Sequence, residues 1–83
     1  MLDRHLQIEI LEHLESLYPR PDYKISKSSL ATRPDFITNI FDLHAKRLVT
    51  LRWGKSLIHN GSPKIVKAKI TYHGLDFLAS HEK

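Results

Sequence analysis

The sequence has 83 residues, enough for one domain with a small core but too few for two domains. Its 41% of hydrophobic residues exclude a disordered chain, and the absence of cysteine excludes disulfides and thiolate metal ligands. The net charge of +4 is unevenly distributed along the chain: residues 1–42 hold seven acids and five bases, whereas residues 43–83 hold two acids and eight bases. This asymmetry favours a polyanionic partner for one side of the molecule.

An amphipathic helix is predicted over about residues 3–17, because apolar residues recur on one arc at 100° per residue. Asp3 is a suitable N-cap, and Pro19 ends the helix. The apolar arc covers about half of the helix circumference, which is more than one small core requires. Two interpretations stay open: a broad core stripe, or a stripe whose surplus forms a homodimer contact. The arc consists of Leu2, Leu6, Ile10, Leu11, Leu14, Leu17 and Tyr18.

The segment 19–35 is predicted to be mostly loop, with a short strand at 23–25 and one helical turn at 28–32. The next helix is predicted from Pro34 to about Lys46, from the helical spacing of Phe36, Ile37, Ile40, Phe41 and Leu43. Its N-cap is either Thr32, in a capping box with Asp35, or Arg33, because Pro34 disfavours α geometry in the residue before it.

After residue 48 the apolar period becomes two, which indicates a β-hairpin with Asn60-Gly61 at its turn. A two-residue turn pairs residues whose numbers sum to 121, so Arg52 lies opposite Lys69 and Gly54 opposite Lys67 on the outer, basic face, which Ile65 shares. A loop lengthened by Pro63 would change this register. The apolar face is predicted to hold Val49, Leu51, Trp53, Val66, Ala68 and Ile70, with Leu51 opposite Ile70 and Trp53 opposite Ala68.

The stretch from Leu43 to Leu75 contains seven Lys or Arg residues and no acid. Directly opposed like charges on a hairpin are unfavourable, and a phosphate between them would relieve the repulsion. Solvent would relieve it too, so the basic hairpin is either a phosphate-binding surface or a solvated edge that prevents aggregation. Because Trp53 falls on the apolar face, it is interpreted as a core anchor of the hairpin rather than a stacking platform.

The tail is predicted to form a helix that Thr71 caps, with Leu75 and Leu78 facing the core. Gly74 in its first turn allows another backbone segment to approach closely, at some loss of helix propensity.

Two segments resemble those of winged helix-turn-helix domains. Ile40–Val49 is similar to the "hLxxLxxxGLV" end of a recognition helix that runs into the wing, and Ile70–Leu78 is similar to the "hTxxGxxhL" opening of the last helix in small bacterial and phage regulators. The resemblance covers nearly the whole chain and implies a single α+β winged-helix domain over residues 1–83, with a three-helix core, a β-hairpin wing and a final helix. Arg47 replaces the usual left-handed glycine, which predicts a different helix end.

The resemblance implies a DNA-binding transcriptional regulator or accessory protein whose partner is duplex DNA. The outward positions of the helix over residues 34–46 are predicted to be Asp35, Thr38, Asn39, Asp42 and Lys46. Asn39 would read adenine, Thr38 would contact a phosphate or a thymine methyl group, and the two acids would repel the DNA backbone. The candidate phosphate-binding residues are Lys27, Arg33, Lys46, Arg47, Arg52, Lys55, Lys64, Lys67 and Lys69.

Other function classes have little support in the sequence. The six histidines form no His-x₃-His pair, so we expect neither a metal site nor a cofactor. There is no cysteine nucleophile, Gly-rich phosphate loop or small-molecule motif, so we do not expect an enzyme. No segment approaches the roughly 18 apolar residues of a membrane span, and we expect a soluble, cytoplasmic protein. The alternative function is a winged-helix module that binds an acidic protein surface instead of DNA.

Overall fold

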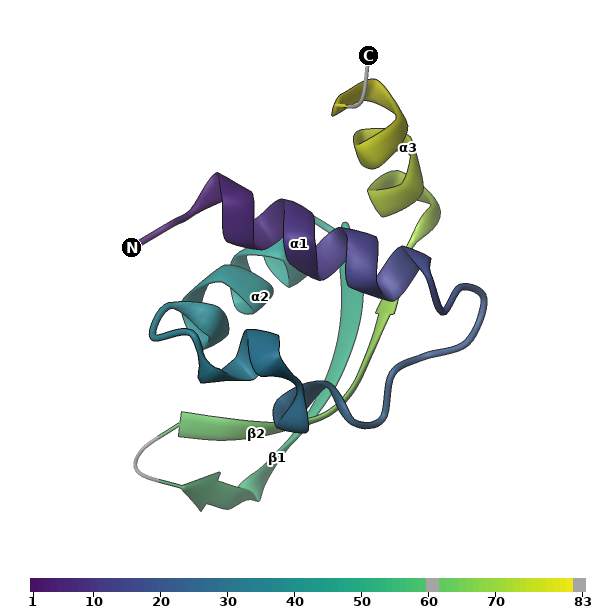
Figure 1. Cartoon of the computed structure of the whole chain (residues 1–83). Coiled ribbons are helices and arrows are strands. Elements are labelled where there is room, and N and C mark those ends of the chain that lie inside the picture. Colours follow the sequence, from purple (N-terminus) through teal and green to yellow (C-terminus); the bar gives the residue numbers. More distant parts are fainter. Residues whose placement is uncertain (60–61, 82–83) are drawn as a thin grey trace.

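The computed structural model describes residues 1–59 and 62–81, and the side chains of these residues except 55–59, 62 and 63. Its helices pack on one face of an antiparallel hairpin (Figure 1). The fold is α+β. Its described elements are α1 (Arg4–Glu15), the 3₁₀ turns η1 (Ile25–Lys27) and η2 (Ser29–Thr32), α2 (Phe36–Ala45), β1 (Val49–His59), β2 (Ser62–Ile70) and α3 (Tyr72–His81).

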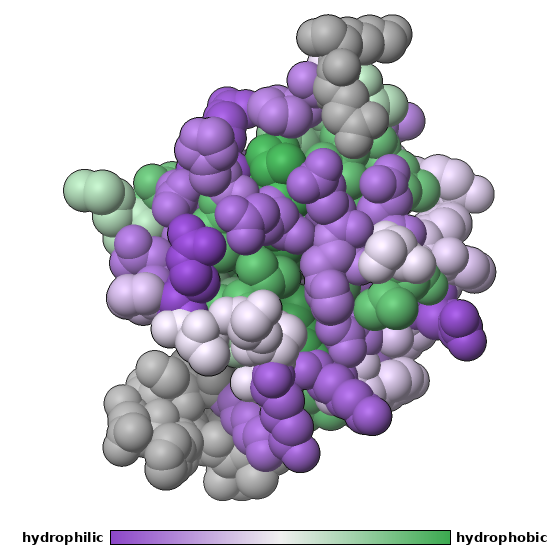
Figure 2. Space-filling view, viewed as in Figure 1, coloured by the Kyte–Doolittle hydropathy of each residue, from purple (hydrophilic) through white to green (hydrophobic). Residues whose placement is uncertain are grey.

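Helix α1 forms where its apolar period predicts, and Asp3 caps it by accepting a hydrogen bond from the Leu6 amide at 3.2 Å. The buried side chains of α1 pack against α2, α3 and β2, so most of the apolar arc is a core stripe. Its opposite face is largely hydrophilic (Figure 2). Leu2 of the arc is exposed and Leu17 and Tyr18 are half-buried, and the homodimer contact stays a prediction. The core cluster is Leu6, Ile10, Leu11, Leu14, Ile25, Phe36, Ile40, Leu43, Val49, Ile65, Ala68, Ile70 and Leu78.

The segment between α1 and α2 is less regular than predicted. The strand expected at 23–25 is reduced to a single bridge at Asp22, whose backbone exchanges hydrogen bonds of 2.7 and 3.0 Å with Ala68 of β2. Ile25 instead begins η1 and inserts into the core. The turn predicted at 28–32 is η2, and no α-helix forms between α1 and α2.

Helix α2 is shorter than the predicted range 34–46, and both proposed N-caps are wrong. The Thr32 hydroxyl donates to the Ser29 carbonyl at 2.6 Å rather than to the start of α2. Arg33 is the C-cap of η2. The N-cap position of α2 is Asp35, whose side chain makes no capping hydrogen bond.

The register of the hairpin agrees with the prediction only beside the turn. His59 pairs with Ser62, as a two-residue turn requires, although Asn60 and Gly61 themselves lie outside the described residues. Toward the base of the hairpin the register shifts, and Arg52 pairs with Lys67 while Trp53 pairs with Ile65. The predicted pairs Leu51–Ile70, Trp53–Ala68, Arg52–Lys69 and Gly54–Lys67 are therefore wrong, and the observed partners are Leu51–Ala68, Trp53–Ile65, Thr50–Lys69 and Gly54–Lys64.

The shift between Arg52 and Trp53 is a β-bulge, because Val66 has no partner across the ladder. One extra residue reverses the alternation beyond it, so Ile65 is 2% exposed and Val66 is 38% exposed, the opposite of the predicted assignment. Trp53 is also 38% exposed, at the rim of the core rather than inside it. Its ring contacts the rings of Phe41 and His44 edge-on, with centroids 5.0 and 5.5 Å apart.

Helix α2 ends in a left-handed residue, although that residue is not glycine. Arg47 has φ of 63°, and its amide donates to the His44 carbonyl at 3.0 Å. The Leu48 amide donates to the Leu43 carbonyl at 3.0 Å, which completes a Schellman motif. The prediction that arginine would change the helix end is therefore wrong.

The start of α3 is hydrogen-bonded to this helix end. The Thr71 hydroxyl accepts from the Gly74 amide at 3.0 Å, as predicted for a cap, and donates to the Arg47 carbonyl at 2.7 Å. The Thr71 amide donates to the Leu48 carbonyl at 3.1 Å. A Cβ on Gly74 would meet the Leu48 carbonyl oxygen and the Ile70 side chain at distances that real Cβ atoms do not show. The predicted close approach at Gly74 is confirmed.

Replacing Gly74 with alanine tests this packing. We expect Gly74→Ala to lower the free energy of unfolding by about 1–3 kcal/mol, because the clash with a backbone oxygen outweighs the gain in helix propensity. Urea denaturation followed by circular dichroism measures the change. Ser80→Ala, at an exposed position of α3, is the control and should stay within about 0.5 kcal/mol of the parent protein. A Gly74→Ala variant as stable as this control would contradict the packing.

Candidate nucleic-acid interface

The outer face of the hairpin carries basic side chains from both strands. The ladder places Lys69 opposite Thr50, Lys67 opposite Arg52 and Lys64 opposite Gly54. Strict alternation would have turned Lys64 toward the core, and the bulge at Val66 brings it to the outer face. We call the resulting surface the basic face, which consists of Arg52, Lys64, Lys67 and Lys69.

Within residues 1–59 and 62–81, the four side chains of the basic face form no ion pair with a carboxylate. Other predicted phosphate-binding residues do have acidic partners. Arg33 lies 3.7 Å from Asp3 and 3.6 Å from Glu9, and Lys46 lies 2.9 Å from Asp42. The basic face is therefore a part of the predicted site whose positive charge is uncompensated, and the Arg52–Lys67 pair places two cations directly opposite each other.

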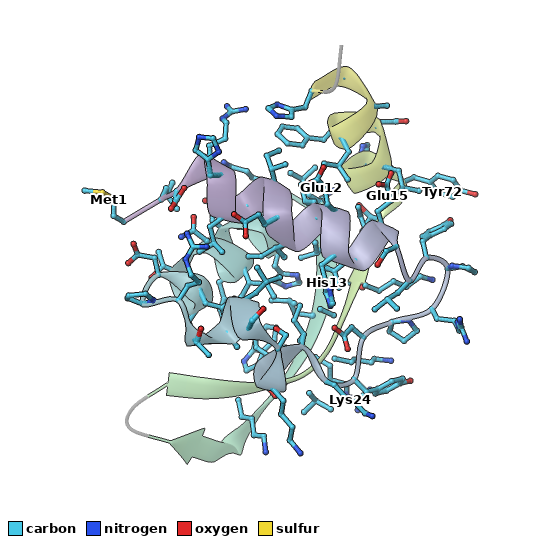
Figure 3. All side chains as sticks on the ribbon, viewed as in Figure 1. Met1, Glu12, His13, Glu15, Lys24 and Tyr72 are labelled. Atoms are coloured by element: carbon cyan, nitrogen blue, oxygen red, sulfur yellow. The ribbon has the colours of Figure 1, made fainter. Side chains whose placement is uncertain are left out.

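Tyrosine rings border the basic face. The ammonium groups of Lys67 and Lys69 lie 5.8 Å from the ring centroids of Tyr23 and Tyr18, respectively, in cation–π geometry. Tyr18 in turn contacts Tyr72 edge-on at 6.4 Å. Figure 3 shows Tyr72 directed outward from the start of α3.

A groove runs along this surface. Its larger part has a volume of about 710 Å³ and is lined by Pro21, Tyr23, Thr50, Leu51, Arg52, Lys67 and Lys69. A smaller hollow of about 280 Å³ adjoins it and shares Thr50 and Lys69 with it; its lining is Tyr18, Thr50, Lys69, Ile70, Thr71 and Tyr72. The groove thus continues from the hairpin to the start of α3.

The loop that carries Tyr23 is fixed by Asp22, the acid nearest to it in sequence. One carboxylate oxygen of Asp22 lies 2.6 Å from His13 Nε2 of α1, and the other accepts the Lys24 amide at 2.8 Å. Figure 3 shows His13 directed from α1 toward this loop. Asp22 is only 9% exposed, so its carboxylate is directed inward. Tyr23, which follows Asp22, lines the groove.

Asn39 does not face outward as predicted. It is fully buried, and its side-chain oxygen accepts from the Asp3 amide at 2.8 Å and from Gln7 Nε2 at 3.0 Å. Its side-chain nitrogen donates to the carbonyls of Asp35 at 2.8 Å and Met1 at 3.2 Å. An amide with all these partners inside the core cannot read a base, so Asn39 is a structural residue.

The other predicted outward residues of α2 give a mixed result. Thr38 is exposed, whereas Asp42 is half-buried and accepts hydrogen bonds of 2.9 Å from Gln7 and Lys46. The hydrogen bond from Lys46, assisted by Gln7, lowers the pKa of Asp42 below its ordinary value despite partial desolvation. Asp35 lies 3.5 Å from the N-terminal amine.

Helix α2 and the basic face lie on opposite sides of the hairpin. Phe41 and His44 of α2 contact Trp53, whose side chain is on the inner face, whereas Arg52 beside it points outward. Arg47 lines a separate hollow together with Lys46, next to Asp76 of α3. The predicted site is therefore divided into several surfaces, and the side chain of Lys55 lies outside those that the structure describes.

The three tyrosines of the chain are the site residues that the sequence did not reveal. Residues 18, 23 and 72 follow no regular spacing in the sequence. The bridge between Asp22 and Ala68 and the position of α3 bring them close together in the fold. The sequence signal that could have identified them is their proximity to basic residues, because every tyrosine lies within three residues of a Lys or Arg.

No protein-family model, curated protein or solved structure matches this chain. Among the described residues, no helix is long and apolar enough to cross a bilayer. Within the same residues, no group of three or more His, Cys, Asp or Glu side chains is arranged to hold a metal ion.

The role of Asn39 can be tested through stability. We expect Asn39→Ala to lower the free energy of unfolding by about 2–3 kcal/mol, because the Asp3 amide and one N–H of the buried Gln7 amide lose their acceptor. Thermal or urea denaturation measures the change. Thr38→Ala, at the neighbouring exposed position, should change stability by less than about 0.5 kcal/mol. Equal stability of the two variants would contradict the structural role.

Proposed function

We propose that the protein binds DNA through phosphate contacts from the basic face of its hairpin. The observation that carries this proposal is the group of four cationic side chains on one face, none of which is paired with a carboxylate in the described part of the chain. Such a surface attracts a polyanion and releases the counterions of the DNA on binding. A bound phosphate would also relieve the repulsion between Arg52 and Lys67.

A winged-helix arrangement is part of this proposal. The order of α1, α2, hairpin and α3 supports it, as does the bridge by which Asp22 adds a third segment to the edge of β2. The Arg47–Thr71 corner also supports it, because the two segments that resemble the family meet there. The two 3₁₀ turns in place of a second α-helix are the main departure from the family.

Phosphate contacts position a protein on DNA without selecting a base sequence. Since Asn39 is buried, the proposed interface does not include base readout by that residue. The proposal therefore favours an accessory DNA-binding protein of low sequence specificity over a regulator that selects one site.

The second candidate is a winged-helix module that binds an acidic protein surface. The observation that favours it is the position of α2, which packs on the inner face of the hairpin and does not share a surface with the basic residues. The basic face would then complement carboxylates instead of phosphates. Affinity for DNA separates the two candidates.

Charge reversal on the basic face tests the proposal. At low salt we expect wild-type protein to bind random duplex DNA with a dissociation constant tighter than about 10⁻⁴ M. The double variant Lys67→Glu/Lys69→Glu should bind roughly 100-fold more weakly, and the slope of log affinity against log salt should fall by about 2, one for each lost phosphate contact. Fluorescence anisotropy of a labelled duplex over a salt series measures both quantities.

The matched control is Arg4→Glu, which reverses a charge on α1 away from the hairpin and should cause a smaller change. Circular dichroism confirms that each variant is folded. Wild-type affinity weaker than about 10⁻⁴ M in low salt would refute binding of duplex DNA. Unchanged affinity of the double variant would remove the basic face from the interface.

A further inference from the structure

We infer that the nucleic acid bound by the basic face is single-stranded, with bases stacked on Tyr23 and Tyr72 and phosphates held by Lys67 and Lys69. This inference rests on the proposed function and adds the form of the ligand. Nucleic-acid surfaces of this kind combine a positively charged groove with aromatic rings on which successive bases stack.

The first observation is where the tyrosines lie. All three tyrosines of the chain border the basic face, and two of them are strongly exposed, Tyr23 at 64% and Tyr72 at 77%. Exposed aromatic rings grouped at one groove indicate a binding surface, because the core gains little from them. Tyr23 lines the larger part of the groove and Tyr72 the smaller hollow, so a ligand that follows the groove meets both rings.

The second observation is the placement of cations beside these rings. Lys67 lies over the ring of Tyr23, and Lys69 lies over the ring of Tyr18, both at 5.8 Å. A phosphate held by Lys67 is therefore adjacent to Tyr23, and the base of the same or the next nucleotide can lie on the exposed part of that ring. Lys69 and Thr50, which line both parts of the groove, continue the contact toward Tyr72.

These rings distinguish a single strand from a duplex. In a duplex the faces of the bases are covered by their neighbours, so Tyr23 and Tyr72 could contact only sugars, phosphates and base edges. A single strand presents unstacked bases, and each base stacked on an aromatic ring adds to the affinity.

Removing the rings without changing the charge tests the inference. We expect labelled oligo(dT) or oligo(U) to bind more tightly than a blunt duplex of equal length at the same salt concentration. Tyr23→Ala and Tyr72→Ala should each weaken single-strand binding roughly 5- to 150-fold while leaving the salt slope unchanged. Tyr23→Phe and Tyr72→Phe keep the ring and should bind nearly as wild type does. Fluorescence anisotropy measures all of these affinities.

The two oligonucleotides distinguish DNA from RNA, because only oligo(U) carries the 2′-hydroxyl, and preference for either one is compatible with the inference. Tighter binding of the duplex, or alanine variants that bind single strands as wild type does, would overturn it. The proposed function would still stand in that case if Lys67→Glu/Lys69→Glu weakened duplex binding. If neither single strands nor duplex bind, the proposed function and this inference fail together.

Discussion

The Thr71 hydroxyl joins the end of α2 to the start of α3, and the arrangement of the domain depends on this contact. It donates to the carbonyl of Arg47, a left-handed residue, and accepts from the Gly74 amide. A non-glycine residue in this conformation costs about 1–2 kcal/mol, which the corner has to offset through its hydrogen bonds and the packing around Gly74. Because β1 leaves this corner and β2 returns to it, the corner fixes which hairpin face meets the helices.

Much of the fold was predictable because its signals are local. The apolar period of α1, the Asp3 cap and the Thr71–Gly74 opening of α3 each occupy a few consecutive residues. The bulge at Val66 was not predictable, because the sequence of Lys64–Ile70 fits two strands equally well. One is a regular strand with Val66 facing the core, and the other is a bulged strand with Ile65 facing the core. Packing against the rest of the core determines which of the two is buried, and the buried residue is Ile65, beside Trp53.

The candidate site was predicted in part for the same reason. The excess of bases after residue 43 is visible in the sequence, whereas the acidic partners of Arg33 are not. Arg33 meets Asp3 and Glu9 across more than 20 residues of chain, and Asn39 meets Asp3 across 36. Such long-range contacts, rather than residue type, separate the cations that neutralise the protein's own acids from those that remain uncompensated.

The bulge makes the chemistry of the hairpin depend on the number of its residues as well as on their identity. Deleting Val66 would remove the bulge and restore regular alternation, with Ile65 still on the core side and Lys64 still on the solvent side. One added residue would instead turn Lys64 toward Trp53 and the core and Ile65 toward solvent. Insertions in this strand should accordingly be tolerated far less than substitutions of its exposed lysines.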